Sequence, residues 1–323
     1  MAATQIRANG AFTVLLWSES DAWFEFAYLF AIVASVMLLV GWRTRTASVL
    51  FMIAVLSVQN RNGFIDDGGD NVFHLMAIYL VPIRCGQVWS LDARLARRGG
   101  AGPDSVGIVL WSILGAAILV ASASGHLSWA WALIFAALWL AHGLSWTVRR
   151  YTTGEPRTVC DMLANLAHNG GLFVIVAQLC VLYASAGWYK IQGTRWQDGT
   201  AAYYPMHVDA FTPWPVLSDA LSSYALPILL MTYGTVIVQV AFPFTLFHRQ
   251  LKNVLLALLI AEHAGIAVLL GLPFFSLAII AADLIFLPTS FMRRVDRKVS
   301  RLLRRSAPPE PAAGERPKEL AHT

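Results

Sequence analysis

The chain has 323 residues, of which 57% are hydrophobic and 13% are charged, with a formal net charge of +5. A typical soluble domain has roughly 45–50% apolar and 25% charged residues, so the composition excludes an ordinary soluble domain as well as collagen, disordered and disulfide-scaffold classes. Most basic residues lie in short loops between apolar runs. This pattern indicates membrane topology and no nucleic-acid partner.

The apolar residues are divided into runs long enough to cross a bilayer, for which about 20 residues are needed. We therefore predict an all-α, polytopic integral membrane protein with about nine transmembrane helices, in which the second and third runs are the shortest. The predicted spans are 23–41, 46–60, 71–87, 106–124, 126–147, 163–189, 223–247, 251–271 and 273–290.

Lys and Arg favour the cytoplasmic ends of membrane spans, and here they alternate consistently from loop to loop. Residues 88–104 and 148–160 are predicted to be cytoplasmic, as is the C-terminus, in a multi-pass protein of the cell membrane. The loop at 190–222 is predicted to be external. Of the 24 basic residues, those on the external side are Arg7, Arg61, Lys190 and Arg195.

Three parts follow from this topology. Residues 1–22 form a short external segment, 23–290 the transmembrane domain, and 291–323 a basic cytoplasmic tail that is partly disordered because of its Pro-rich end at 306–323. The first 22 residues carry no signal peptide. A truncated start stays open as an alternative, since one upstream helix would make the number of spans even.

Cysteines and acidic loop residues give no strong metal or disulfide signal. The three cysteines Cys85, Cys160 and Cys180 lie at the inner face or inside a helix, so no structural disulfide is expected, and none has zinc-ligand spacing. Asp66, Asp67 and Asp70 alternate with glycines and could bind a cation, but acidic turn residues are usually solvated. We predict no metal site.

Ionisable residues within a membrane are costly and therefore informative. His168 is roughly 33 Å along its helix from Lys190, which places it at the inner face, in a stripe that packs helices by hydrogen bonds. By contrast, the residues predicted to share an outward-facing polar cavity are Glu25, Asp70, His74, Lys190, Glu262 and His263.

Lys190 is the most informative single residue. The chain has four lysines beside 20 arginines, and this one is predicted to be external. It follows the small and aromatic segment 183–189, which removes water from the amine and favours its neutral form. A neutral amine can act as a general base, whereas a guanidinium cannot. The structural alternative is a lysine that snorkels at a helix end.

The segment after Lys190 is aromatic and contains several prolines, so residues 190–222 are predicted to be ordered. We expect it to lie on the outer surface and to cover the mouth of the cavity as a lid. Trp196 is the residue of this segment assigned to the cavity.

The element Gly187-Trp188-Tyr189-Lys190 followed by Trp196-Gln197-Asp198-Gly199 resembles the HTTM (horizontally transferred transmembrane) superfamily. This superfamily includes vitamin K-dependent gamma-carboxylases and the sporulation-delaying-protein B family. The resemblance extends over residues 40–100 and 175–290, including Asn60-Arg61-Asn62 and Glu262-His263. The chain departs from the carboxylases because it lacks their large lumenal domain after Pro288 and adds a helix pair at 105–147.

The resemblance implies two alternative functions. In the first, Lys190 corresponds to the carboxylase base that deprotonates a reduced quinone, His263 assists it, and Asp70, His74, Trp196 and Glu262 line the substrate cavity. The substrate is then a quinol or an extended peptide. In the second, the chain is a non-catalytic maturation or export partner of a secreted antimicrobial peptide. The sequence does not define an oligomeric state.

Overall fold

The computed structural model describes residues 12–61, 68–97 and 105–305, and every regular element in these ranges is an α-helix or a 3-10 helix. The predicted all-α class is therefore confirmed for this part of the chain. Asp66, Asp67 and the predicted disordered end at 306–323 lie outside the described residues.

Six helical segments are long and apolar enough to cross a membrane, or seven if a bent pair counts as one span. The bent pair is α13 (Pro273–Asp283), extended by the 3-10 turn η5 (Leu284–Phe286), and α14 (Thr289–Arg305), with 108° between its two parts. The six segments are α2 (Asp21–Val40), α6 (Ser105–Ala123), α7 (Trp129–Tyr151), α8 (Glu155–Gln192), α11 (Ala225–Ala241) with η4 (Phe242–Thr245), and α12 (Arg249–Leu269).

The remaining two predicted spans form shorter helices. The run at 46–60 is α3 (Thr44–Gln59), and the run at 71–87 overlaps α4 (Gly68–Leu80), which stops two residues before Pro82. Proline disfavours helical geometry in the residue before it, so the helix ends there although the apolar run continues. The predicted total of about nine spans thus exceeds the six or seven that meet the length requirement.

The outer surface of these helices is strongly apolar, as expected for contact with lipid. Within the six candidate spans, between 6% and 28% of the residues are buried inside the protein. Large apolar side chains such as Leu39, Leu119 and Phe173 are instead exposed. Since soluble monomers rarely expose such large apolar surfaces, the structure is that of a helical membrane protein.

Local signals in the sequence explain where the helices begin and end. The Ser20 hydroxyl accepts a hydrogen bond from the Trp23 amide (3.2 Å) at the start of α2, and Gly41 ends this helix in the left-handed conformation (φ 72°). Pro156 and Pro273 lie in the first turns of α8 and α13. Proline is tolerated there because backbone N–H groups in the first turn have no intrahelical acceptor, so the missing N–H costs no hydrogen bond.

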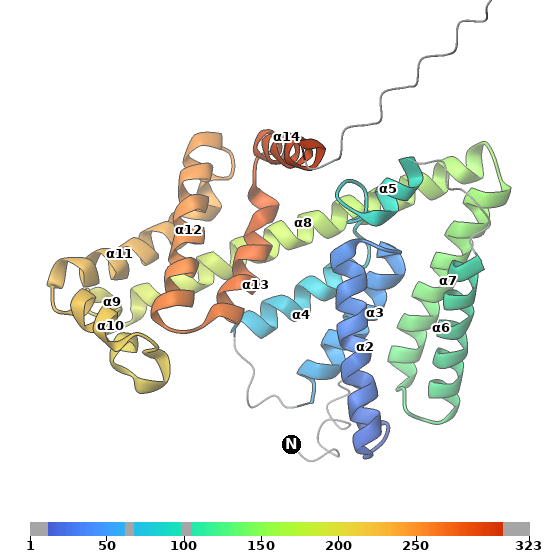
Figure 1. The fold of residues 1–323 in the computed structure, drawn as a ribbon, viewed down its shortest axis with the longest axis horizontal. Helices are drawn as coiled ribbons and strands as arrows, with labels where there is room; N and C mark the ends of the chain where they lie inside the picture. Colours follow the sequence, from blue (N-terminus) through green and yellow to red (C-terminus); the bar gives the residue numbers. More distant parts are fainter. Residues whose placement is uncertain (1–11, 62–67, 98–104, 306–323) are drawn as a thin grey trace, which may run out of the picture.

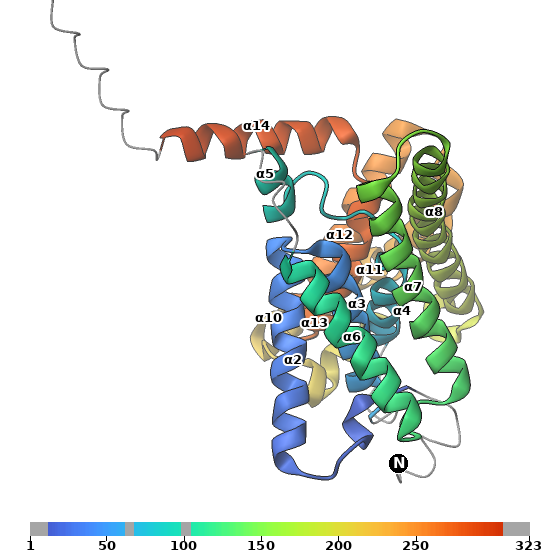
Figure 2. The same ribbon diagram turned by 90° about the vertical axis from the view of Figure 1, so that its right-hand side faces the viewer.

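Basic residues collect at one end of the molecule, which we call the basic face. It holds α5 (Leu91–Arg97), the connection from α7 to α8, the start of α12 and the flat-lying α14 (Figures 1 and 2). The opposite end holds the start of α2, the turn between α6 and α7, and the segment between α8 and α11 (Figure 1). The helices therefore run between a basic and a less basic end.

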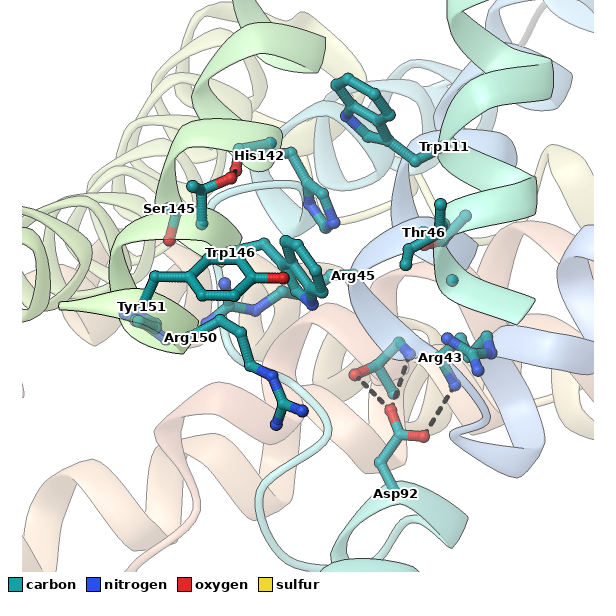
Figure 3. A pocket seen from close by; sticks show the side chains of 16 residues that line it. Arg43, Arg45, Thr46, Asp92, Trp111, His142, Ser145, Trp146, Arg150 and Tyr151 are labelled. Carbon is teal, nitrogen blue, oxygen red and sulfur yellow. Dashed lines mark hydrogen bonds between the residues drawn. The ribbon is translucent and has the colours of Figure 1, made fainter. Parts of the chain in front are cut away.

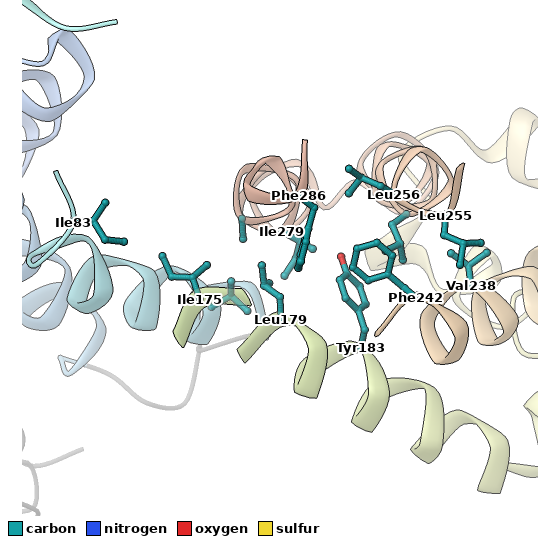
Figure 4. Packing of buried hydrophobic residues seen from close by; sticks show 13 residues of the cluster. Ile83, Ile175, Leu179, Tyr183, Val238, Phe242, Leu255, Leu256, Ile279 and Phe286 are labelled. Carbon is teal, nitrogen blue, oxygen red and sulfur yellow. The ribbon is translucent and has the colours of Figure 1, made fainter. Parts of the chain in front are cut away.

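The main hydrophobic core lies where α8 passes α11, α12 and α13 (Figure 4). Leu179 and Tyr183 of α8 are buried against Phe242 and Leu259, and the Tyr183 and Phe242 rings meet edge to face at 5.6 Å. A second cluster joins the N-terminal residues around η1 (Val14–Leu16) to α3, α6 and α7. The first of these clusters supports the candidate site.

The segment between α8 and α11 is ordered, as predicted. It contains α9 (Thr194–Gln197), η2 (Pro205–His207), η3 (Asp209–Phe211) and α10 (Pro215–Ser222). It is fixed to α11 by the Ala202 amide, which donates to the Thr232 hydroxyl (3.1 Å), and by the Tyr233 hydroxyl, which donates to the Gln197 carbonyl (2.9 Å).

Candidate functional site

A chain of three polar side chains crosses from α8 through α11 to α12. The Lys190 Nζ donates to the Gln239 Oε1 (2.6 Å), and the Gln239 Nε2 donates to the Glu262 Oε1 (2.6 Å). Gln239 is buried, while Lys190 and Glu262 are half-buried. An amine and a carboxylic acid are thus connected through one amide.

The close approach of α8 and α11 depends on Gly187. A Cβ atom at this position would lie 2.5 Å from the Val240 Cγ2 and 3.2 Å from the Val240 amide nitrogen. Glycine therefore lets α8 come close to α11 one turn before Lys190, and Gln239 is the neighbour of Val240. Small residues serve the same purpose in membrane helix packing generally.

Trp196 closes the site on the side of the segment between α8 and α11. The Lys190 Nζ lies 5.2 Å from the centre of its ring, within the range of a cation–π contact. The helix α9, which carries Trp196, follows α8 after the single residue Gly193. The predicted pairing of Lys190 and Trp196 in one site therefore has a direct geometric basis.

His263 lies on the same helix as Glu262 but faces the hydrophobic core. Its ring is 6.5 Å from that of Tyr183 and 5.7 Å from that of Phe275. The residue is buried, and both ring nitrogens lack a hydrogen-bond partner among the described residues. Such a group retains the capacity to bond a ligand oxygen.

Tyr183 connects His263 to a further buried acid. Its hydroxyl donates to the Asp283 Oδ2 (2.7 Å), and both residues are fully buried. The site thus consists of the Lys190–Gln239–Glu262 chain and an adjacent group of His263, Tyr183 and Asp283. All six side chains come from α8, α11, α12 and α13.

Three of the predicted cavity residues lie elsewhere. Glu25 is exposed on α2, a helix that contributes no residue to the Lys190 site. Asp70 is exposed at the start of α4 and lines an apolar cavity of about 680 Å³ between α2, α4, α8 and α13. Among the described residues, the lining of this cavity includes neither Lys190 nor His263, although Phe275 borders both regions. His74 is half-buried on α4 and is likewise not in that lining.

The polar stripe near the start of α8 belongs to the basic face. α8 is continuous from Glu155 to Gln192, so His168 and Lys190 remain far apart. The His168 Nδ1 accepts a hydrogen bond from the Arg84 amide (3.2 Å), and Asp161 pairs with Arg149 (2.9 Å). Asp161 therefore joins α8 to α7, and His168 joins α8 to the connection that follows α4.

No group of three potential metal ligands occurs in the described ranges, and the three cysteines are free. Gln239, Tyr183 and Asp283 are the site residues that the sequence patterns did not assign to the cavity. A polar amide in the otherwise apolar run 225–241 is itself a signal, because polar side chains within membrane helices usually bond across to another helix.

Comparison with known proteins finds no matching family model, no similar curated protein and no similar solved structure.

Proposed function

We propose that the chain is an HTTM-like membrane enzyme in which Lys190 acts as a general base on a lipid-soluble acid. The observation that carries this proposal is the Lys190–Gln239–Glu262 hydrogen-bonded chain. Gln239 holds the amine at a fixed position, and Glu262 balances the positive charge that Lys190 gains when it takes a proton. His263 is the second residue that we assign to the reaction, and its role is to orient the substrate.

A reduced quinone is the proposed substrate, and the residues fit such a group. Its hydroxyl supplies an acidic proton when it is bound. His263 has two buried ring nitrogens without partners in the described part of the chain, so it can orient a hydroxyl oxygen. Phe275 connects His263 to the 680 Å³ apolar cavity, which has room for a hydrophobic tail. Lys190 then accepts the proton at its Nζ.

We further propose about nine membrane crossings in the cell membrane, with the C-terminus in the cytoplasm. The short helices α3 and α4 would count as crossings in this topology because α3 packs on the long helix α2, and α4 packs on the long helix α8 and on α13. The distribution of basic residues supports the inward position of the basic face.

The proposal is tested by oxygen uptake of proteoliposomes supplied with a reduced naphthoquinone, because deprotonation accelerates the reaction of a quinol with oxygen. We expect Lys190→Arg and Lys190→Ala both to lose the protein-dependent rate, since a guanidinium cannot accept the proton. Lys298→Arg, the same change on the exposed surface of α14, is the matched control and should keep it.

An active Lys190→Arg protein would remove the general-base role. Absence of any protein-dependent uptake by the unaltered chain would remove the quinol and leave the second candidate, a maturation or export partner of a secreted peptide. The external segment favours that role through exposed aromatic side chains, among them Trp214 (59% exposed) and Tyr224 (70% exposed). Crosslinking of a secreted peptide to this segment would then be the decisive measurement.

A further inference from the structure

A second cavity, of about 750 Å³, opens at the basic face and is separate from the Lys190 site. It lies between the start of α3, the start of α6 and the end of α7 (Figure 3). Its walls combine arginines with tryptophans and small polar residues. Since the residues around Lys190 do not line it, the proposed enzyme activity does not account for it.

The cavity carries an excess of positive charge. Four arginines line it, namely Arg43, Arg45, Arg149 and Arg150, against one carboxylate, Asp92. Figure 3 shows Arg45 and Arg150 extending across the space between the helices. At this density, mutual repulsion of the guanidinium groups opposes the arrangement unless an anion is present.

The single carboxylate is already engaged. Asp92 accepts hydrogen bonds from the Arg43 amide (2.8 Å), the Thr44 amide (2.8 Å) and the Thr44 hydroxyl (3.0 Å), as the dashed lines of Figure 3 indicate. It therefore serves as the N-terminal cap of α3. Both of its carboxylate oxygens are thereby bonded to the start of α3.

Three of the guanidinium groups keep capacity for a ligand. Arg149 pairs with Asp161, yet its Nε is buried and has no hydrogen-bond partner in the described part of the chain. The side chains of Arg45 and Arg150 take part in no ion pair or hydrogen bond with any described residue. Arginine forks match the oxygens of a phosphate group.

The other wall of the cavity is apolar and aromatic. Ile108 and Trp111 come from α6, and Trp146 contacts Tyr151 edge to face (6.0 Å) at the end of α7. Trp and Tyr are typical of the depth at which lipid headgroups meet the acyl chains. A ligand that suits both walls has an anionic head and an apolar body.

We infer that this cavity binds the phosphate headgroup of an anionic phospholipid from the inner leaflet. Basic pockets between membrane helices on the cytoplasmic side are suited to such headgroups. Arg45 and Arg150 would bind the phosphate oxygens, while Trp111 and Trp146 contact the first part of the acyl chains. The same phosphate chemistry could come from a soluble phosphate, so the experiment separates the two sources.

The test is native mass spectrometry of the full chain in detergent, titrated with phosphatidylglycerol, with phosphatidylcholine and with inorganic phosphate. We expect one tightly bound phosphatidylglycerol and no comparable binding of phosphatidylcholine. The double variant Arg45→Gln/Arg150→Gln should weaken phosphatidylglycerol binding by about tenfold or more, as expected for the loss of charge-assisted hydrogen bonds.

The matched control is Arg94→Gln/Arg97→Gln, which removes two exposed arginines of α5 from the same face but outside the cavity. It should leave the bound lipid within about twofold of the unaltered chain, because distant surface charges are screened. An equal loss in both double variants would overturn the site in favour of general surface charge. Equal binding of phosphatidylcholine, or full displacement of the lipid by inorganic phosphate, would overturn a phospholipid ligand.

Discussion

Gln239 joins two ionisable side chains because a primary amide accepts and donates hydrogen bonds at the same time. Its oxygen accepts from Lys190 and its nitrogen donates to Glu262. A hydrophobic residue of similar size could satisfy neither, and each group left unsatisfied in an apolar environment would cost roughly 1–3 kcal/mol. The Gln239 amide therefore links Lys190 of α8 to Glu262 of α12 through two hydrogen bonds.

At the same scale, Asp198 makes the segment between α8 and α11 sensitive to acid. Hydrogen bonds from the Thr200 hydroxyl and amide, with the nearby Arg195, lower the pKa of this carboxyl below its ordinary value of 3.8. Because the folded pKa is lower than the unfolded one, the turn is stabilised above pH 3.8. This contribution is lost as the pH falls through the folded pKa.

We therefore expect the protection of the Thr200 amide in hydrogen exchange, corrected for intrinsic rates, to be constant at neutral pH and to fall below pH 3.8. In Asp198→Asn the side chain cannot titrate, so protection should change little over the same range. An unaltered chain whose Thr200 protection does not respond to acid would show that the carboxylate does not hold this turn.

The sequence predicts individual site residues only where their chemistry is unusual. Lys190, Glu262 and His263 stand out as ionisable groups in apolar runs, and Trp196 stands out through the sequence element that carries the family resemblance. The partner of Lys190 could not be predicted, because the contact depends on how α11 is rotated against α8. That rotation is set by the packing of Gly187 on Val240, which lies 53 residues away in the chain.

At the scale of helices, two glycines of α8 should respond in opposite ways to the same substitution. Gly187→Ala places a methyl group against Val240 and should destabilise the protein by about 1–3 kcal/mol, as overpacking generally does. A methyl group added at Gly170 would meet no atom within 4 Å, so Gly170→Ala should stabilise the helix by about 0.5–1 kcal/mol.

Thermal unfolding of both variants in the same detergent measures this difference, and it controls for the change in helix propensity. Equal shifts for the two variants would mean that α8 and α11 are not in close contact at Gly187. In a separate measurement, oxygen uptake of the Gly187→Ala protein reports whether the Lys190 to Gln239 contact depends on the close approach of α8 to α11.

The helix α14 is the clearest amphipathic element. Phe291, Val295 and Val299 lie on one side, whereas Arg293, Arg297 and Arg301 lie on the other by helical spacing. The 108° bend after α13 turns the helix across the basic face, where Asp296 accepts a hydrogen bond from the Trp89 Nε1 (2.9 Å). Such a helix lies in the interface with its apolar side toward the acyl chains.

One tryptophan added on either side of α14 should report this orientation. Val299→Trp is expected to show blue-shifted emission, and brominated lipids should quench it. Arg301→Trp, about 160° away around the helix, should emit as in water and resist quenching. Each is compared with the unaltered chain to subtract its native tryptophans. Equal quenching of both positions would exclude an interfacial orientation.

Helix lengths show where a hydropathy reading of the sequence succeeds and where it fails. For the spans at 23–41 and 106–124, the structure places the helix ends within two residues of the prediction. For 71–87 and 273–290 the apolar run outlasts the helix. Pro82 ends the first, and η5 with the bend before α14 ends the second, because hydropathy does not report backbone geometry.

The whole molecule combines these features into a polarity from one end to the other. Arginines of α5, α7, α12 and α14 gather at the basic face, and the Lys190 site lies toward the opposite end of α8 (Figure 1). If positive loops remain in the cytoplasm, then the arginine-lined cavity between α3, α6 and α7 faces the inner leaflet and the Lys190 site faces outward. The two sites would therefore meet different lipid and solvent compartments.

Two cysteines at opposite ends of one protein test this orientation. Cys85 is exposed in the connection between α4 and α5 at the basic face, and Asp209 is exposed in η3, between α8 and α11. With Cys160 and Cys180 replaced by alanine, a membrane-impermeant maleimide should label Asp209→Cys in intact cells. It should label Cys85 only after permeabilisation. Opposite labelling is expected for the two cysteines in the same preparation. A general failure of the label to react therefore cannot produce the expected pattern. Labelling of Cys85 but not of position 209 in intact cells would show that the protein has the opposite orientation in the membrane. Lys190 would then lie on the cytoplasmic side, and every conclusion that depends on its outward position would be wrong.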